Sequence, residues 1–143
     1  MTISEHVGVL LHKVDLNITN YLKKELIPYQ LAPEQHLLMA LLLESEGLSQ
    51  SEISETLQKD KSSVTRMIVS LEKKGYIHRA ISKMDRRSVE VYLTEEGRDL
   101  EEVINRVSKN TKALLEGSFE ENELTELKRL LMKVQSNLDA YMK

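Results

Sequence analysis

The sequence predicts a mainly α-helical fold with a small β-hairpin, arranged as a winged helix-turn-helix with N- and C-terminal dimerisation helices. Three observations support this fold class. Apolar residues follow a helical period near both ends of the chain, two short helices meet at a three-residue turn in its middle, and a segment of two-residue period follows. With 143 residues, of which 41% are hydrophobic, the chain is sized for one core. We expect a single domain over residues 1–143, with dimerisation helices at 1–31 and 98–143 and the winged module at 33–97.

The first segment predicts one long helix that ends before Pro28, because proline cannot continue a helix. A second helix is expected from Pro33, since proline is favoured at the first helical position, and Gly47 should follow its end. It contains the longest apolar run, residues 37–43, which is far shorter than the roughly 20 residues that cross a bilayer. This run therefore predicts a buried helix and no membrane span. The apolar stripe of the first helix comprises Ile3, Val7, Leu10, Leu11, Val14, Ile18, Tyr21, Leu22 and Leu26.

A capping box opens the third helix. The Ser49 hydroxyl can accept the amide three residues later, while the Glu52 carboxylate can accept the Ser49 amide. This helix is short, with Ile53 and Leu57 facing inward, and residues 58–60 provide only enough chain for a tight turn. Another helix must therefore follow at an angle.

Asp60 is the expected N-cap of that next helix, and Gly75 is the expected left-handed residue at its end. Val64, Ile68 and Leu71 face inward at helical spacing. Together the two helices predict a helix-turn-helix over about residues 49–74.

A change of period after residue 75 predicts the hairpin. Val89, Val91 and Leu93 alternate with polar or amphipathic residues, as in a half-buried strand. Residues 76–81 form the partner strand, and the polar, basic segment 82–87 connects the two. We expect this wing to span about residues 76–94.

The last third is expected to be helical again, with a second capping box formed by Ser118 and Glu121. The long terminal helices carry more apolar surface than the small central module can cover. Part of that surface should be buried against a second copy, so we expect a homodimer with a two-fold axis.

Charge is distributed unevenly along the chain. Residues 59–87 contain nine Lys or Arg and three Asp or Glu, a balance of +6, whereas the whole chain carries −3. A basic block in an acidic protein indicates a face that meets a polyanion. The alternative interpretation is a solvated run of charges with no partner.

The outward face of the second short helix is the predicted reader of the DNA major groove. The first turn of the preceding helix has exposed amides that suit a phosphate. The alternative is that these polar groups only cap and solvate the helix ends. The predicted contacts are Ser49 and Gln50 on the first helix, and Lys61, Ser62, Ser63, Thr65 and Arg66 on the second.

The wing adds Lys83, Arg86 and Arg87, which suit a narrow minor groove where negative potential is concentrated. Asp85 lies among these cations. It either closes the turn or orients a guanidinium through a charge-assisted hydrogen bond. A merely solvated loop remains the alternative.

The run Lys61–Arg79 (KSSVTRMIVSLEKKGYIHR), then Asp85-Arg86-Arg87, then Val91–Gly97 (VYLTEEG) resembles the MarR family, the multiple antibiotic resistance regulators. The order of helices agrees, so the resemblance spans the chain. It implies a MarR-type homodimer joined by its first and last helices, which binds palindromic double-stranded DNA with one recognition helix in each major groove. It also implies that Arg87 lies at the minor groove and pairs with Asp60. Ala32 departs from the family, which often has a hydroxyl cap there.

Family members often release DNA when a small phenolic or anionic effector binds between the dimer helices and the winged module. The candidates for such a pocket are Tyr29, His36 and Met39, although apolar residues at helical spacing are more often core. The chain has no Cys, which excludes thiol-based sensing, and no two of its four His are spaced to share a helix face. We therefore expect no metal site and no cofactor.

The predicted function is sequence-specific transcriptional regulation, as a repressor that a small-molecule effector releases from DNA. We expect a cytoplasmic location because residues 1–6 do not resemble a secretion signal. One alternative is a winged-helix module that binds protein and not DNA. An enzyme is not expected, since the sequence lacks a phosphate-binding glycine loop, a Cys nucleophile and clustered metal ligands.

Overall fold

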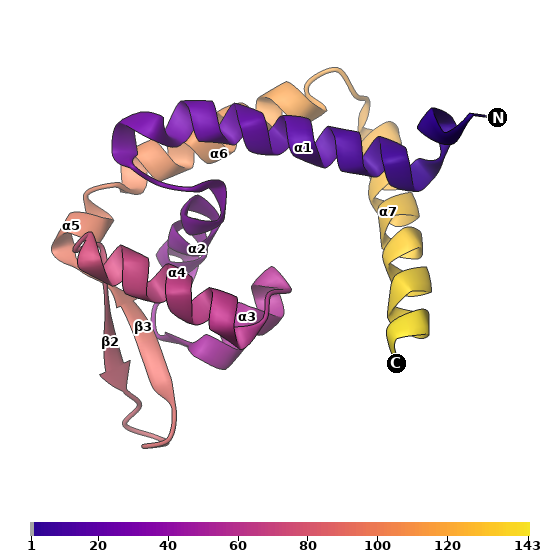
Figure 1. Ribbon diagram of the computed structural model, residues 1–143. Helices are drawn as coiled ribbons and strands as arrows, with labels where there is room; N and C mark the ends of the chain where they lie inside the picture. The colour runs from indigo at the N-terminus through magenta and orange to yellow at the C-terminus, as the bar shows by residue number, and fades with distance from the viewer. Residues whose placement is uncertain (1) are drawn as a thin grey trace. The chain divides into compact units, whose positions relative to one another are not determined.

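The computed structural model describes residues 2–143 and groups them into two compact units that divide after Val107. The predicted mainly helical fold with a small antiparallel sheet is confirmed (Figure 1). The first unit comprises a 3₁₀ turn at Ile3–Glu5, α1 (Val7–Leu26), a 3₁₀ turn at Ile27–Tyr29, α2 (Pro33–Glu44), β1 (Leu48–Ser49), α3 (Gln50–Leu57), α4 (Lys61–Lys73), β2 (Ile77–Ile81), β3 (Val89–Leu93), α5 (Glu95–Arg98) and the start of α6 (Glu101–Glu116). The second unit comprises the rest of α6 and α7 (Glu121–Met142).

The first helix begins later than the sequence indicated. His6 has an extended backbone, with φ −67° and ψ 139°, and it separates the turn at Ile3–Glu5 from α1. The helix ends at Leu26, and Pro28 lies in the following 3₁₀ turn, as expected of a proline. At the start of α2, the Ala32 amide donates to the Gln35 side-chain oxygen at 3.0 Å. This bond supplies half of a capping box where the cap residue has no hydroxyl.

The sheet has three strands in the order β1-β3-β2, all antiparallel. The predicted hairpin of β2 and β3 pairs Ile77 with Leu93 at its base and Ile81 with Val89 near its tip. The sequence analysis did not predict β1, which has only two residues and pairs Ser49 with Glu90. Because β1 runs directly into α3, the central strand β3 joins the hairpin to the start of α3.

The core of the first unit contains most of the residues that helical and strand periodicity predicted to face inward, whereas Leu57 and Val89 are half-buried. Val91 and Leu93 are buried on one face of β3. Leu37 departs from the expectation of a fully buried α2, because 53% of its surface is exposed. The largest fully buried side chains are Leu26, Leu38, Met39, Leu42, Ile53, Val64, Ile68, Leu71, Ile77, Val91 and Ile104.

A short helix, α5, which the sequence analysis did not predict, separates β3 from α6. Thr94 caps α5 by accepting the Gly97 amide at 3.0 Å, and its hydroxyl donates to the Gly75 carbonyl at 2.5 Å. Gly97 itself lies against the backbone of Tyr76: a Cβ atom added to Gly97 would lie 2.1 Å from the Tyr76 carbonyl oxygen. The glycine therefore permits a close backbone approach at the base of the hairpin.

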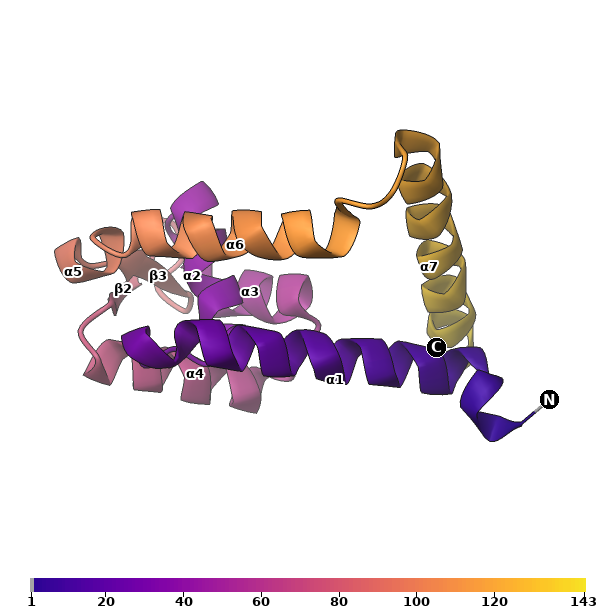
Figure 2. The same ribbon diagram turned by 90° about the horizontal axis from the view of Figure 1, so that it is seen from above.

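In the second unit, α7 is a single unbroken helix (Figure 2). It begins two residues later than predicted, with the Glu120 amide donating to the Glu123 carboxylate at 2.9 Å in place of the Ser118 and Glu121 pair. None of its residues is buried. Within residues 2–143, no helix combines the length and apolar character needed to cross a membrane. The exposed large apolar side chains from residue 108 onward are Leu114, Leu115, Phe119, Leu127, Leu130, Leu131, Met132, Leu138, Tyr141 and Met142.

Candidate nucleic-acid interface

Helices α3 and α4 contact each other and lie within the predicted helix-turn-helix range. Gln58 takes the left-handed conformation between them, with φ of 54°. Its side-chain amide donates to the Glu55 carbonyl at 3.0 Å, and the Ser54 hydroxyl donates to the Lys59 carbonyl. One bond satisfies a carbonyl in the last turn of α3 and the other satisfies a carbonyl of the turn itself, so the tight turn is held by polar side chains of α3 and the turn.

The predicted capping box at the start of α3 is formed. The Glu52 amide donates to the Ser49 hydroxyl at 3.0 Å, and the Ser49 amide donates to the Glu52 carboxylate at 3.2 Å. Gln50, the first residue of α3, donates from its side-chain amide to the Thr65 hydroxyl of α4 at 3.2 Å. The two predicted phosphate contacts, Ser49 and Gln50, therefore lie beside the predicted base-reading helix.

Most of the predicted reading residues of α4 are exposed. Lys61, Ser62, Thr65 and Arg66 are exposed and Ser63 is half-buried, whereas Val64 on the other side of the helix is buried. The outward face forms a shallow groove of about 460 Å³. This groove is lined by Thr65, Arg66, Val69, Ser70, Lys73 and Lys74. Cations therefore line a surface that is open to a partner.

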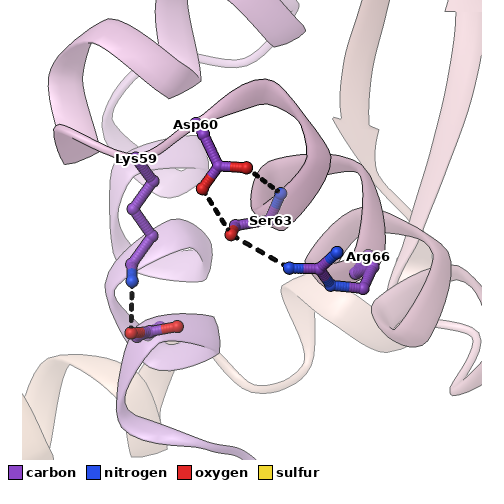
Figure 3. Close-up of polar contacts among 5 residues, drawn as sticks. Lys59, Asp60, Ser63 and Arg66 are labelled. Carbon is purple, nitrogen blue, oxygen red and sulfur yellow. Dashed lines mark hydrogen bonds and ion pairs between the residues drawn. The ribbon is translucent and has the colours of Figure 1, made fainter.

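Asp60 caps α4, as predicted, and it also orients an arginine (Figure 3). Its carboxylate accepts the Ser63 amide at 3.1 Å and the Ser63 hydroxyl at 2.6 Å. The Arg66 guanidinium in turn donates to the Ser63 hydroxyl at 3.1 Å. These two hydrogen bonds from Ser63 hold the pKa of Asp60 below its ordinary value, and the bond from the hydroxyl has the larger effect. The carboxylate thus stays charged and fixes Ser63, which directs Arg66.

Both ends of α4 are attached to the region of α2 through residues that the sequence did not single out. Before the helix, Lys59 forms an ion pair of 2.5 Å with Glu34. At its end, the Lys74 ammonium donates to the Gln35 side-chain oxygen at 2.9 Å and to the Gln30 carbonyl. The Gln35 side-chain amide also donates to the Ser70 hydroxyl at 3.0 Å. Gln35 is buried, so its polar groups need these partners.

The predicted cations of the wing, Lys83, Arg86 and Arg87, are all exposed in the loop at the far end of the β2–β3 hairpin (Figure 1). Asp85 closes the turn: its carboxylate accepts the Arg87 amide at 3.0 Å, and its carbonyl accepts the Ser88 amide at 2.9 Å. Of the two roles predicted for Asp85, the structure shows turn closure. The wing therefore presents three exposed cations, while the carboxylate of Asp85 among them is hydrogen-bonded to a main-chain amide.

The pair between Asp60 and Arg87, which the family resemblance implied, is not formed. Within residues 2–143, no ion pair or hydrogen bond joins these two side chains. The Asp60 carboxylate is engaged with Ser63, and the Arg87 main chain with Asp85. In this structure the Asp60 carboxylate is therefore bonded to α4 and not to the wing.

Ser82 is the main residue of the wing that the sequence analysis missed. Only 7% of its surface is exposed, although it lies in a polar loop. Its hydroxyl accepts the amides of Met84 and Asp85, both at 3.2 Å. Hydrogen bonds from the hydroxyls of Ser82 and Tyr92 also hold the pKa of Glu90 below its ordinary value. The polar sequence of the loop had indicated that Ser82 is exposed, and no local pattern linked Ser82 to Glu90.

The three candidates for an effector pocket lie at different depths. Met39 has no exposed surface and belongs to the core. His36 is 7% exposed, and its Nε2 donates to the Ile104 carbonyl at 3.1 Å. Burial lowers the pKa of His36, an effect that the Ile104 hydrogen bond partly opposes. Tyr29 is half-buried, and its hydroxyl accepts from the exposed Arg106 guanidinium at 2.8 Å. Only Tyr29 among the three thus has a polar group near the surface.

Nothing in the described part of the chain, residues 2–143, gathers three His, Asp or Glu side chains closely enough to hold a metal ion. The one aromatic stacking contact in this part joins His78 and Tyr92, with ring centroids 5.5 Å apart. His78 therefore packs on the face of the hairpin.

Comparison with known proteins identifies the family. The model of the MarR family matches residues 31–89. The regulator PecS of Dickeya dadantii is 33% identical over 135 residues, which cover 90% of this chain and 79% of PecS. The chain belongs to the MarR family. Members of the MarR family are transcriptional regulators and not enzymes.

Other MarR relatives share less of their length or sequence. The regulator TtmR of Methylorubrum extorquens is 38% identical over 72 residues, which cover 50% of this chain but only 37% of TtmR. The solved structure of the Staphylococcus aureus MepR–DNA complex superposes with a TM-score of 0.86 over 92% of this chain and 98% of MepR, at 23% identity. That similarity supports the MarR fold of the whole chain.

Proposed function

We propose that this MarR-family chain is a sequence-specific regulator that binds double-stranded DNA. The observation that carries the proposal is the arrangement of exposed cations on two parts of one folded unit. Lys61 and Arg66 lie on α4, and the wing cations lie at the end of a hairpin whose central strand also pairs with β1 at the start of α3. A rigid unit of this kind can place a helix in one groove and a hairpin in the next.

Each predicted contact has a role in this proposal. The outward face of α4 reads base edges in the major groove, with Arg66 held by Ser63 as a hydrogen-bond donor for guanine or phosphate. Ser49 and Gln50 approach the phosphate backbone at the start of α3. Arg87, with Lys83 and Arg86, enters or flanks the minor groove. MepR was solved with DNA bound, and its fold resembles that of this chain.

The active form in this proposal is a homodimer on a palindromic site. The terminal helices expose apolar side chains that one chain leaves uncovered, including Leu10 and Val14 on α1 and Leu131 and Leu138 on α7. Exposed apolar surface of this extent is typical of an interface. A two-fold dimer presents two copies of α4, and half-sites one helical turn apart require these copies to be about 34 Å apart.

Repression with release by a small effector completes the proposal. An operator-bound dimer in the cytoplasm blocks transcription, and an effector that favours another spacing of the recognition helices releases it. Tyr29 and Arg106 supply a phenol and a guanidinium beside each other, a pair that suits a phenolic or anionic compound. His36 and Met39 lie in the core on the neighbouring helix α2.

The decisive experiment is selection of bound sequences from random DNA duplexes with the purified protein. We expect one palindromic sequence to be enriched, and affinity for it to fall steeply as salt is added, because bound cations displace counterions from DNA. Arg87→Ala should weaken binding to that site by about tenfold at fixed salt, the value of one good charge-assisted contact. Lys109→Ala, which removes an exposed cation outside both the wing and α4, is the control and should bind like the unaltered chain.

The alternative function is a winged-helix module that binds a protein. In that case the selection returns no preferred sequence, and any DNA binding is weak and equal for all duplexes. Unchanged affinity of the Arg87→Ala variant would also remove the wing from the proposed contact surface.

A further inference from the structure

Ser82 occupies an unusual place in the wing, because its side chain is buried while the residues around it are exposed. Its hydroxyl accepts two main-chain amides of the loop, those of Met84 and Asp85, both at 3.2 Å. The Ser82 amide also donates to the Ser88 carbonyl at 2.9 Å. The backbone of the loop is therefore gathered around one hydroxyl.

The β2–β3 ladder connects this loop to the rest of the sheet. Ile81, directly before Ser82, pairs with Val89, and farther along the hairpin the Tyr92 ring stacks on His78 with an interplanar angle of 16°. In the main chain, Glu90 pairs with Ser49, the residue that caps α3. A continuous chain of contacts thus leads from the wing loop to the start of the helix-turn-helix.

We infer that Ser82 is a positioning residue for DNA binding, which sets the direction of the wing cations by tying the loop backbone to the end of the β2–β3 ladder. This inference rests on the proposed function. Ser82 is too buried to contact DNA itself, so it can act only through the cations beyond it. Asp85 closes the turn locally, whereas Ser82 fixes the turn relative to β3.

A double-mutant cycle with Arg87 distinguishes positioning from a general effect on stability. We expect Ser82→Ala to weaken binding to the selected site about fivefold at fixed salt, corresponding to the loss of one or two neutral hydrogen bonds. We also expect Arg87→Ala to weaken binding much less in the Ser82→Ala background than in the unaltered chain. In that background the Arg87 guanidinium is already misplaced and contributes little to DNA binding, so its removal costs little affinity. Equal effects of Arg87→Ala in both backgrounds would overturn the inference.

Hydrogen exchange gives a second readout that does not depend on DNA. The amides of Met84 and Asp85 should exchange faster in Ser82→Ala, because their acceptor has been removed. Unchanged exchange of these two amides would show that the hydroxyl does not hold the loop. Ser118→Ala, an exposed serine in the second unit, is the matched control and should change neither exchange nor binding.

Ser82→Cys keeps the inference testable if Ser82→Ala fails to fold. A thiol is similar in size to the hydroxyl but accepts hydrogen bonds only weakly. We expect about twofold weaker binding and a reduced effect of Arg87→Ala in this background as well, and additive effects would overturn the inference. Failure of the unaltered chain to select any sequence would instead refute the proposed function, so the two failures are distinguishable.

Discussion

Replacing Gly97 with alanine adds a single methyl group, but we expect it to lower the free energy of unfolding of the first unit substantially. A Cβ atom at this position would lie 2.1 Å from the Tyr76 carbonyl oxygen and 3.1 Å from its carbonyl carbon. That carbonyl is main chain, and it accepts the Thr94 amide at 3.0 Å, so it cannot turn aside without losing a hydrogen bond. The clash must be relieved by moving α5 away from the start of β2.

The expected cost follows from these contacts. Forcing an extra carbon into a packed site costs about 1–3 kcal/mol, and weakening one main-chain hydrogen bond adds about 1 kcal/mol. Alanine has a lower conformational entropy than glycine in the unfolded chain, which offsets about 0.5–1 kcal/mol of this cost. We therefore expect the free energy of unfolding to fall by about 1–3.5 kcal/mol, which would lower the urea midpoint by roughly 1 M.

Urea unfolding followed by far-ultraviolet circular dichroism measures this effect, at one protein concentration because the proposed dimerisation would shift apparent stability. Gly8→Ala is the control, since a Cβ atom at Gly8 in α1 meets nothing within 4 Å. That variant should be as stable as the unaltered chain or slightly more stable, because alanine is favoured in helices. If Gly97→Ala unfolds at the urea midpoint of the unaltered chain, the close approach of α5 to Tyr76 is refuted.

Two further predictions concern stability. Burial lowers the pKa of His36, so its contribution to stability is complete above the ordinary value of 6.5 and declines as the pH falls below it, because the unfolded chain then binds a proton more readily than the folded one. Urea midpoints at pH 7.5 and 5.5 should therefore differ less in His36→Gln than in the unaltered chain, and an equal difference would contradict this assignment. Ser49→Ala should lower the free energy of unfolding by about 1 kcal/mol through loss of the α3 cap, whereas Ser51→Ala, at an exposed position, should not; equal urea midpoints for the two variants would count against the cap.

The features that the sequence predicted correctly depend on residues close together in the chain. The caps at Ser49 and Asp60 act on amides three residues away, and Gly75 ends its helix with φ of +83°. Buried positions such as Val64 and Val91 follow a period that their own segment reveals. These signals are local, so one sequence contains them completely.

The features that were missed depend on distant partners or on a single backbone angle. β1 exists because Leu48 and Ser49 pair with β3, about forty residues later, and two residues cannot display an alternation. The attachment of α4 through Lys74 and Gln35 likewise joins residues far apart in the chain. His6 interrupts the first helix while the apolar spacing continues through it, since side-chain periodicity does not register one extended residue.

In the proposed function, the attachment of α4 at both ends has a consequence for how an effector would act. To tilt this helix alone, a ligand would have to separate Lys59 from Glu34 and Lys74 from Gln35 together. It is easier to displace α2, α4 and the hairpin as one piece, which leaves the set of side chains facing each half-site unaltered. An inducer would then change how firmly the two halves of an operator are held without changing which bases are preferred, so sequence preference and ligand response could evolve separately.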